Sequence, residues 1–292
     1  MSTSRKKILV TGANGQLGSE FKDLESTQPD YEFLFTSVNE LDITKKDEVF
    51  SYFRTYNPAF CINCAAYTAV DKAEEEQERA FLINSTAVGY LTIASKLAGT
   101  KLIHFSTDYA YDSVTDRPIK ESDLCQPRSI YGLSKRGGEK VLEESDIDWI
   151  CLRVSWLYGA HGHNFVKTMT RLGKERDQLT VISDQKGAPT YAKDLAEVVM
   201  HIISLNQGYR AHYNYSNGGI TDWAAFAREI MEIQKLSCTI QETTTEAYGS
   251  PAPRPLWSVM SHKKITKTFG VDIIPWQQSL GQCIHRIQNQ VV

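Results

Sequence analysis

The sequence has no long apolar run and no surplus of basic residues. No segment approaches the roughly 18 apolar residues that a membrane-spanning helix needs, so we expect no contact with a membrane. The 32 lysines and arginines are balanced by 35 acidic residues, for a formal net charge of −3. This balance lacks the basic footprint of a protein that binds nucleic acid. Residues 1–7 lead directly into a strand pattern, so we expect no signal peptide and a cytoplasmic protein.

The six cysteines give little sign of a metal or redox site. Cys61 and Cys64 have CxxC spacing, but neither a second CxxC pair nor a histidine pair follows them. They lie in an apolar run typical of a buried strand, on which residues three apart face in opposite directions. We therefore interpret them as buried thiols of the core and expect no metal site.

The first half of the sequence alternates short apolar runs with segments of helical periodicity. Strands are expected at residues 7–11, 31–36, 60–65, 101–106 and 149–155, and helices between them at 16–24, 44–57, 74–97 and 131–144. Such alternation predicts an α/β fold with a doubly wound parallel sheet of the Rossmann type.

The second half is less regular, with helices expected at 165–174, 192–205 and 221–234, a short strand at 212–216 and a proline-rich loop at 250–255. We expect residues 1–155 to form the sheet domain, with residues 190–216 returning to it. Residues 156–189 and 217–292 are expected to form a smaller, partly interleaved C-terminal lobe that binds the substrate.

A glycine-rich turn follows the first expected strand and opens a helix. Its glycines are spaced GxxGxxG, whereas the common dinucleotide fingerprint is GxGxxG. Gly12 permits a tight turn, Gly15 lets the backbone approach a pyrophosphate, and Gly18 lets the helix pack close to the strand. The position of this turn favours a dinucleotide site over a purely structural turn. We expect that site to comprise Gly12, Asn14, Gly15, Gln16, Leu17 and Gly18.

The end of the second expected strand lacks both the acid typical of NAD sites and an arginine. Because Ser37 can hydrogen-bond a 2′-phosphate, NADPH is the expected cofactor, and NADH use is also compatible. Asp42 and Ile43 are expected to bracket the adenine. The alternative for Asp42 is to cap the helix that begins near Thr44.

Tyr131 and Lys135 lie four residues apart and share one face of an expected helix. A free tyrosine has a pKa of about 10, and a lysine charge nearby is expected to lower that pKa by stabilising the phenolate. Tyr131 is then able to give a proton to a carbonyl oxygen that is being reduced. The pair is common by chance, but its place after the fourth strand favours catalysis.

Thr107 and Asp108 stand at the end of the fourth expected strand, and ligands of open α/β sheets bind outside the carboxyl ends of strands. We expect the Thr107 hydroxyl to hydrogen-bond the reacting oxygen and Asp108 to bind a substrate hydroxyl. A structural Ser-Thr-Asp turn is the alternative.

Taken together, these motifs resemble the extended short-chain dehydrogenase/reductase family, and further blocks resemble its dTDP-4-dehydrorhamnose reductases. The blocks are CAAYTAVDKAE at 64–74, STDYAYD at 106–112, RVSWLYG at 153–159, NFVKTM and DQKGAPT within 164–190, and PAPRP at 251–255. The resemblance runs in register over nearly the whole chain.

The resemblance implies the NAD(P)H-dependent reduction of the C4 keto group of dTDP-4-dehydro-6-deoxy-L-mannose to dTDP-L-rhamnose, the last step of dTDP-rhamnose synthesis. Tyr131 would protonate the C4 oxygen, and Lys135 would also hold the nicotinamide ribose. The cofactor would further be lined by Ala65, Ala66, Tyr67 and Thr68.

For the substrate, the resemblance implies that Trp156 packs against the sugar, although an indole there is also compatible with the core. Arg254 is the candidate for the diphosphate, since a guanidinium can hold phosphate with two hydrogen bonds. A solvent-exposed arginine is its alternative, and Asn164 is the weaker candidate.

Some family members are described as dimers bridged by magnesium, which acidic residues near the C-terminus hold. Residues 285–292 contain no carboxylate side chain, and hard cations need oxygen ligands. We therefore do not expect the magnesium bridge, and the protein is expected to be a monomer or a homodimer.

Two other functions are compatible with the fold. Related epimerases and dehydratases share the glycine loop and the tyrosine–lysine pair, but dehydratases usually have a glutamate where this chain has Tyr109. A non-catalytic relative serves as a regulatory subunit of methionine adenosyltransferase. The intact Thr107, Tyr131 and Lys135 favour an enzyme over that binding protein.

Overall fold

The computed structural model describes residues 5–111 and 116–290 and is built on a six-stranded parallel sheet. The strand order is β10-β5-β4-β3-β1-β2, so the chain winds outward in both directions from β1. This confirms the doubly wound α/β fold. The strands are β1 (Lys6–Thr11), β2 (Tyr31–Thr36), β3 (Phe60–Asn63), β4 (Lys101–Thr107), β5 (Trp149–Val154) and β10 (Arg210–Tyr215).

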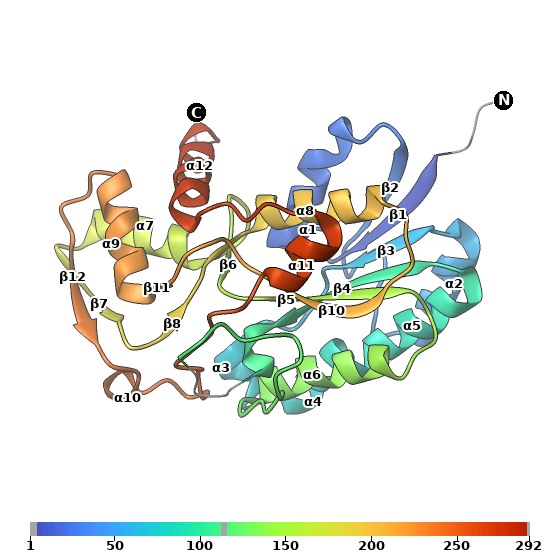
Figure 1. Ribbon diagram of the computed structural model, residues 1–292, viewed down its shortest axis with the longest axis horizontal. Helices are drawn as coiled ribbons and strands as arrows, with labels where there is room; N and C mark the ends of the chain where they lie inside the picture. The colour runs from blue at the N-terminus through green and yellow to red at the C-terminus, as the bar shows by residue number, and fades with distance from the viewer. Residues whose placement is uncertain (1–4, 112–115, 291–292) are drawn as a thin grey trace.

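Helices cover both faces of the sheet (Figure 1). One layer holds α1 (Gln16–Leu24), α8 (Ala192–Ser204) and α11 (Lys263–Phe269), and the other holds α2 (Lys46–Tyr56), α5 (Ala87–Ala98) and α6 (Ile130–Glu143). Successive side chains of β1 point to opposite faces of the sheet. Ile8 and Val10 pack into the core beneath α1 and α8, and Leu9 packs into the core beneath α2 and α5. The strands are apolar throughout because both of their faces are buried.

Cys61 and Cys64 follow the same alternation. Cys61 is buried in the core on the α5 side, whereas Cys64 packs against the core on the α8 side. Both thiols are free, as expected for core residues whose side chains point to opposite faces of the sheet.

A second core lies outside the sheet, in the lobe on the left of Figure 1. It is formed by α7 (Phe165–Glu175), β7 (Gln178–Ile182), α9 (Trp223–Ile233), β12 (Thr239–Thr243) and α12 (Trp276–Asn289). The sequence analysis missed the β7–β12 pair. β12 has only one apolar residue, Ile240, so it carries no strand pattern. The remaining short elements are β6 (Leu157–Tyr158), β8 (Lys186–Gly187), β9 (Thr190–Tyr191), β11 (Thr221–Asp222) and α10 (Thr245–Tyr248).

The helix expected at 74–97 is interrupted. The chain instead forms α3 (Val70–Ala73), α4 (Gln77–Phe81), a π-helical turn (Leu82–Thr86) and then α5. The turn lies where α6 approaches most closely: a Cβ at Gly138 would lie only 2.3 Å from the carbonyl oxygen of Asn84. Hydrophobic periodicity does not reveal such a turn, because it depends on a contact between two helices.

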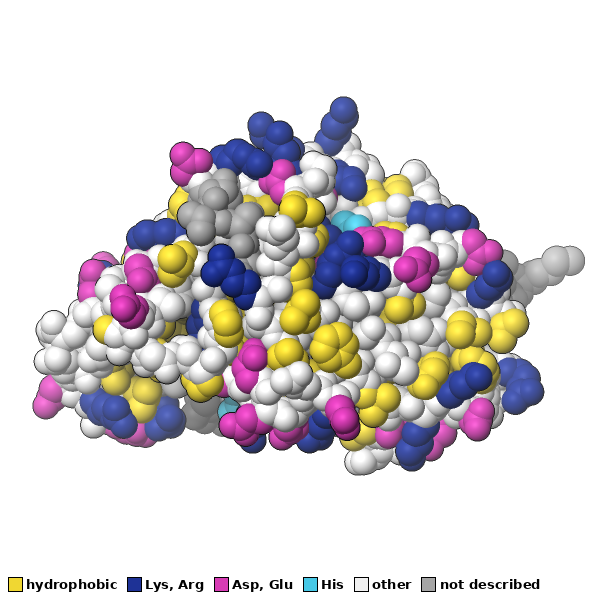
Figure 2. Space-filling view, turned by 90° about the horizontal axis from the view of Figure 1, so that it is seen from below, with side chains coloured by type: hydrophobic (Ala, Val, Ile, Leu, Met, Phe, Trp, Pro, Cys, Tyr) yellow, Lys and Arg dark blue, Asp and Glu magenta, His cyan; other side chains and the backbone are white. Residues whose placement is uncertain are grey.

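The face formed by α4, α5 and α6 carries acidic, basic and hydrophobic side chains side by side (Figure 2). Ile93 and Leu97 of α5 are among the exposed hydrophobic residues. Within residues 5–111 and 116–290, every helix is too short or too polar to span a bilayer.

Candidate active site

The glycine loop between β1 and α1 forms one wall of the site. Gly12 has a φ of +63°, and a Cβ there would lie 2.6 Å from the backbone nitrogen of Ala65, so this turn requires glycine. A Cβ at Gly18 would lie 2.5 Å from the carbonyl oxygen of Gly12, so the helix packs against the turn itself. Gly15 caps α1 and faces the site. The loop thus presents the N-terminus of a helix to any bound anion.

A cavity of about 610 Å³ opens at the carboxyl ends of β1, β3, β4 and β5, where the strand order reverses. The predicted residues that line it are Gly15, Gln16, Leu17, Ala66, Thr68, Thr107, Asp108, Tyr131, Lys135, Trp156 and Arg254. The sequence analysis missed other lining residues, among them Asn63, Phe105, His163 and Trp223. The cavity therefore joins the glycine loop, the tyrosine–lysine pair and the smaller lobe in one space.

Thr107 connects the reacting groups at the floor of the cavity. Its hydroxyl donates to Asp108 Oδ1 at 3.1 Å and accepts from the Tyr109 backbone N–H at 3.2 Å. A further hydrogen bond joins Thr107 to the Tyr131 phenol. The Tyr109 ring packs edge-on against Tyr131, with ring centroids 5.5 Å apart. The phenol and the threonine hydroxyl are thus placed to meet one substrate oxygen together.

The expected effect of Lys135 on Tyr131 is wrong for this structure. Burial raises the pKa of Tyr131 above its ordinary value, the hydrogen bond with Thr107 opposes the rise, and Asp108 and Tyr109 add to it. The phenol therefore stays protonated, because the loss of solvation outweighs any nearby positive charge. A protonated tyrosine is the form that a proton donor requires.

Lys135 lies on α6 one turn after Tyr131 and is only 3% exposed. Burial lowers its pKa to about 8, partly opposed by Cys151, Glu139 and Cys64. Asp108 is also 3% exposed, and burial raises its pKa to about 6 against hydrogen bonds from Ser258 and Thr107. In the part of the chain that the structure describes, neither of the two has an ion-pair partner.

Asn84 is a further residue that the sequence analysis missed. From the π-helical turn, its side chain accepts from the Tyr67 backbone N–H and donates to the Tyr67 carbonyl, each at 2.9 Å. It also donates to the Ser134 hydroxyl at 3.0 Å. Asn84 thereby joins the loop after β3 to the catalytic helix α6, and the only sequence signal for it is a polar residue in an otherwise apolar helix face.

An aromatic wall closes the cavity on the side of the smaller lobe. The Trp156 indole stacks on Trp223 at 3.8 Å between ring centroids, and Trp223 Nε1 donates to Gln185 at 3.0 Å. Trp156 has a φ of +47°, and a Cβ at Gly187 would lie 2.7 Å from its ring. Protein contacts therefore fix the position of Trp156 at the cavity, which is where the sequence analysis expects a sugar contact.

The two diphosphate candidates have different surroundings. Arg254 lines the cavity mouth and pairs with Asp71, so it is neither free nor simply solvent-exposed. Asn164 caps α7 by accepting from the Lys167 backbone N–H at 3.1 Å. Its amide donates to Gly159 at 2.8 Å and to Gln16 at 3.0 Å. These contacts give Asn164 a structural role.

The sequence and fold of this chain match those of known proteins. A family model described as the RmlD substrate binding domain matches residues 6–289. The chain belongs to this family.

Individual proteins are similar to this chain over nearly their whole length. The spore coat polysaccharide biosynthesis protein SpsK of Bacillus subtilis is 40% identical over 94% of this chain and 96% of its own. A solved dTDP-4-dehydrorhamnose reductase from Clostridium acetobutylicum has 39% identity and a TM-score of 0.92, covering 97% of this chain and 99% of its own. The same enzyme from Bacillus anthracis, solved in complex with NADP, has 35% identity, a TM-score of 0.92 and the same coverage.

Within this family fold, the expected ribose-binding position holds an acid that the sequence analysis overlooked. Ser37 donates from both its backbone N–H, at 2.7 Å, and its hydroxyl to the carboxylate of Glu40. These hydrogen bonds lower the pKa of Glu40. Lys22 donates to Asn14 Oδ1 at 2.7 Å nearby. The end of the strand itself holds no acid, as expected, but the chain turns back after Ser37 and brings Glu40 to this position.

Several other cofactor candidates do not line the cavity. Asp42 accepts from the backbone N–H of Thr44 at 3.0 Å and from its hydroxyl at 2.7 Å, which favours the role at the start of the helix. Ile43 is 5% exposed, and its side chain packs into the core. Tyr67 packs among Ala73 and Ala80 and is oriented by Asn84.

Arg286 of the C-terminal helix α12 occupies a cluster of side chains that could otherwise bind a metal ion. Glu20, Asp23 and His161 bring possible ligand atoms together, but Arg286 of α12 donates to Glu20 at 2.6 Å and to Asp23. The guanidinium neutralises this cluster. The residues present therefore do not fit a metal at this place.

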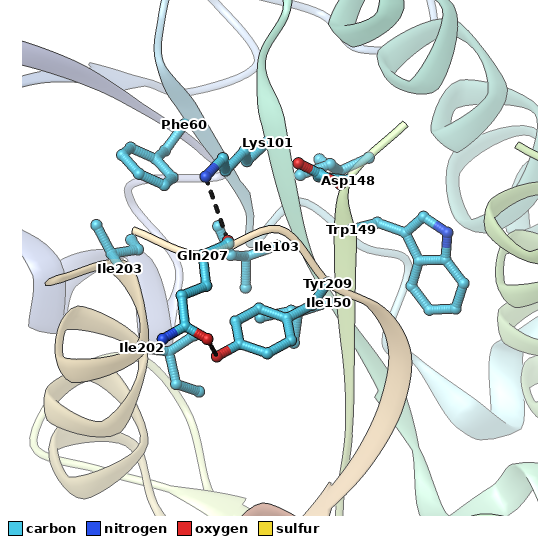
Figure 3. Close-up of a pocket in the computed structure, with 11 residues that line it drawn as sticks. Phe60, Lys101, Ile103, Asp148, Trp149, Ile150, Ile202, Ile203, Gln207 and Tyr209 are labelled. Carbon is cyan, nitrogen blue, oxygen red and sulfur yellow. Dashed lines mark hydrogen bonds between the residues drawn. The ribbon is translucent and has the colours of Figure 1, made fainter. Parts of the chain in front are cut away.

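A second pocket lies at the opposite edge of the sheet, at the amino ends of the strands (Figure 3). Lys101 donates there to the Gln207 carbonyl at 3.2 Å, and Tyr209 donates to the Gln207 side chain at 2.7 Å. Its volume of about 20 Å³ suits a single water. The cavity at the carboxyl ends is the candidate active site because the glycine loop, Tyr131 and Lys135 line it together.

Proposed function

We propose that the protein reduces the C4 keto group of dTDP-4-dehydro-6-deoxy-L-mannose to dTDP-L-rhamnose with NAD(P)H, the last step of dTDP-rhamnose synthesis. The observation that carries this proposal is the meeting of Tyr131, Thr107 and Lys135 in one cavity that begins at the glycine loop. The two solved relatives, at 39% and 35% identity, are dTDP-4-dehydrorhamnose reductases, which supports the same substrate.

The residues present fit a dinucleotide. The close contact between Gly12 and Ala65 leaves no room for a Cβ, and Gly15 opens the start of α1 to a pyrophosphate. Lys135 is positioned to hold the nicotinamide ribose. Ala66 and Thr68 line the same cavity, which extends from the glycine loop to Lys135. When bound, a reduced nicotinamide supplies the hydride for the sugar carbon.

Tyr131 is the proton donor to the C4 oxygen in this proposal. The Thr107 hydroxyl donates to the same oxygen or to Asp108, so it polarises the carbonyl and holds the sugar in place. Lys135, on the next turn of the same helix, holds the nicotinamide ribose beside the phenol. Asp108 and Trp156 contact the sugar, and Arg254 contacts the diphosphate.

The cofactor choice and the cellular setting are part of the proposal. NADPH and NADH both remain compatible, but Glu40 occupies the donors of Ser37 that would hold a 2′-phosphate.

The free cysteines suit a reducing compartment, so we place the reaction in the cytoplasm. We also propose the division into a dinucleotide-binding domain, 1–155 with 190–216, and a substrate lobe, on the basis of the two separate cores. The expected lobe 217–292 is too wide, because α11 packs into the core of the sheet. We keep a monomer or homodimer as the proposed assembly.

The test is to incubate the purified protein with NADPH and the 4-keto sugar while following the absorbance of the reduced nicotinamide. The proposal predicts loss of one NADPH for each dTDP-rhamnose formed. Product formation without net loss of NADPH would indicate an epimerase or a dehydratase, which regenerate their cofactor. Binding of NADPH without turnover would indicate a regulatory binding protein.

A further inference from the structure

An ion pair joins the two lobes at the mouth of the cavity. Arg254, in the proline-rich loop of the smaller lobe, donates from Nη2 to both carboxylate oxygens of Asp71, at 2.8 and 2.9 Å. Asp71 belongs to α3, the helix that follows the cofactor-lining residues Ala66 and Thr68. The Ala252 backbone N–H adds a hydrogen bond to Asp71 Oδ1 at 3.3 Å. The Asp71 carboxylate thus helps to hold the proline-rich loop to the dinucleotide-binding domain.

The donors of Arg254 are almost fully used in this arrangement. Nε donates to the Ser250 hydroxyl at 3.1 Å, Nη1 donates to the Tyr109 hydroxyl at 3.2 Å, and Nη2 serves Asp71. A guanidinium has five N–H donors and holds phosphate best through two parallel bonds. Arg254 therefore cannot present a fork to a diphosphate until one partner leaves.

Asp71 is the one charged partner of Arg254 among the described residues, and it is open to solvent. Its side chain is 44% exposed and that of Arg254 is 22% exposed, so water can take over the hydrogen bonds of the released carboxylate. Ion pairs with this exposure contribute little to stability. A diphosphate also brings more negative charge to the guanidinium than one carboxylate does. The exchange removes a like-charge contact, because Asp71 and the diphosphate would otherwise face each other across Arg254.

We propose that Asp71 is the counter-ion that the substrate diphosphate replaces on Arg254, which makes Asp71 a specificity-determining residue. The proposal rests on the proposed function, in which Arg254 binds the diphosphate. Ligands without a diphosphate do not displace Asp71, so the ion pair discriminates against free sugars and unphosphorylated nucleosides. Tyr109 links this exchange to the reacting groups, since its hydroxyl contacts Arg254 and its ring packs on Tyr131.

The experiment measures binding of dTDP by calorimetry to the wild-type protein, Asp71→Asn, Arg254→Ala and the double variant. Asparagine keeps an oxygen for the Ala252 N–H but removes the charge. We expect Asp71→Asn to bind dTDP about two- to fivefold more tightly. Binding to this variant no longer has to break the ion pair, and a surface ion pair contributes only a small free energy. The substitution should have no effect in the Arg254→Ala background, because the carboxylate acts only through Arg254.

Two controls separate this exchange from a general change in charge. Glu78→Gln removes one charge from exposed α4 nearby and should leave dTDP binding unchanged. Thymidine, which lacks phosphate, should bind wild type and Asp71→Asn equally. Thermal unfolding checks that each variant is folded, and Asp71→Ala serves as a second variant should the asparagine variant be unstable.

Weaker or unchanged dTDP binding by Asp71→Asn would overturn the exchange and assign Asp71 the role of holding Arg254 in place. Equal tightening in the Arg254→Ala background would overturn it as a general charge effect. Failure of wild type to bind dTDP would overturn the diphosphate role of Arg254 as well. Turnover of the 4-keto sugar, measured on the same wild-type preparation, reports on the proposed function independently of these results.

Discussion

Two successive turns of α6 hold buried charges in opposite ways. On one turn, Glu139 accepts from Arg153 at 2.7 and 2.8 Å, and the two side chains are 0% and 2% exposed. Arg153 also donates to the Tyr111 hydroxyl at 2.6 Å. On the preceding turn, Lys135 faces the cavity and, among the described residues, has no ion-pair partner. Glu139 is paired within the protein, and Lys135 is left for ligands.

The difference explains why one helix can be both anchor and active site. The Arg153 guanidinium outweighs burial and lowers the pKa of Glu139, so this pair stays charged and fixes α6 to β5. Burial without a partner moves the pKa values of Lys135 and Asp108 toward neutrality. Such groups destabilise the fold and are available for chemistry. The following variants test this contrast, from the largest expected effect to the smallest.

Tyr131→Phe should abolish most of the turnover. It removes only the phenolic oxygen, and loss of a general acid commonly lowers kcat by about 10²- to 10⁴-fold. Dinucleotide binding, measured by fluorescence titration, should persist because the glycine loop is unchanged. Near-normal turnover by this variant would sink the assignment of Tyr131 as proton donor.

Arg153→Met should destabilise the protein without removing any cavity residue. Glu139 would then keep only the 3.1 Å contact of Arg136, and breaking one partner of a buried ion pair costs up to about 3–5 kcal/mol. The double variant Arg153→Met with Glu139→Leu should recover much of this loss, since it leaves no uncompensated charge. Urea unfolding measures both effects. A loss below about 1 kcal/mol in the single variant, the range of a surface pair, would contradict the anchoring role.

Asp108→Asn should stabilise the protein at pH above 7. Burial raises the pKa of Asp108 from 3.8 to about 6. The contribution of this carboxyl group to the stability of the fold is therefore complete below its pKa in the unfolded chain, and it is lost as the pH rises through its pKa in the folded protein. Asparagine does not ionise, so the variant does not lose this stability. The loss of unfolding free energy is on the order of 3 kcal/mol for a pKa shift of about two units. Unfolding free energies should therefore diverge as the pH rises and converge near pH 4. Parallel pH curves for the two proteins would refute this assignment.

The pH profile of kcat/KM should report Lys135. Burial lowers its pKa to about 8, so activity should decline as the pH rises through this value and the ammonium loses its proton. The limiting slope for one group is about tenfold per pH unit. Lys135→Arg keeps its charge over this range and serves as the comparison, so its decline should move to higher pH whatever its maximal rate. A decline at the same pH in both proteins would assign it to another group.

Sequence patterns were sufficient for those parts of the site that depend on order along the chain. The alternation of strands and helices predicts the parallel sheet, and this sheet brings Thr107 and Tyr131 to the same edge as the glycine loop. Trp156 and Arg254 rest on the family blocks and also line the cavity. These residues follow from connectivity, since the carboxyl ends of parallel strands meet at one edge.

Contacts between distant segments were beyond the sequence patterns. The turn that brings Glu40 back to Ser37, the π-helical turn at Asn84 and the Asp71–Arg254 pair each depend on packing. The pKa direction of Tyr131 was wrong for the same reason. Spacing places Lys135 one helical turn away, but it does not give the burial that dominates in the folded protein.

The central claim is that hydride reaches C4 of the sugar while Tyr131 protonates the C4 oxygen. The most direct measurement supplies the 4-keto sugar with NADPH that carries deuterium at the transferred position and analyses the product by NMR and mass spectrometry. We predict one deuterium at C4 of dTDP-rhamnose for each NADPH consumed, at a rate greatly reduced in Tyr131→Phe. Deuterium at another carbon, or product formed without net loss of NADPH, would contradict the account.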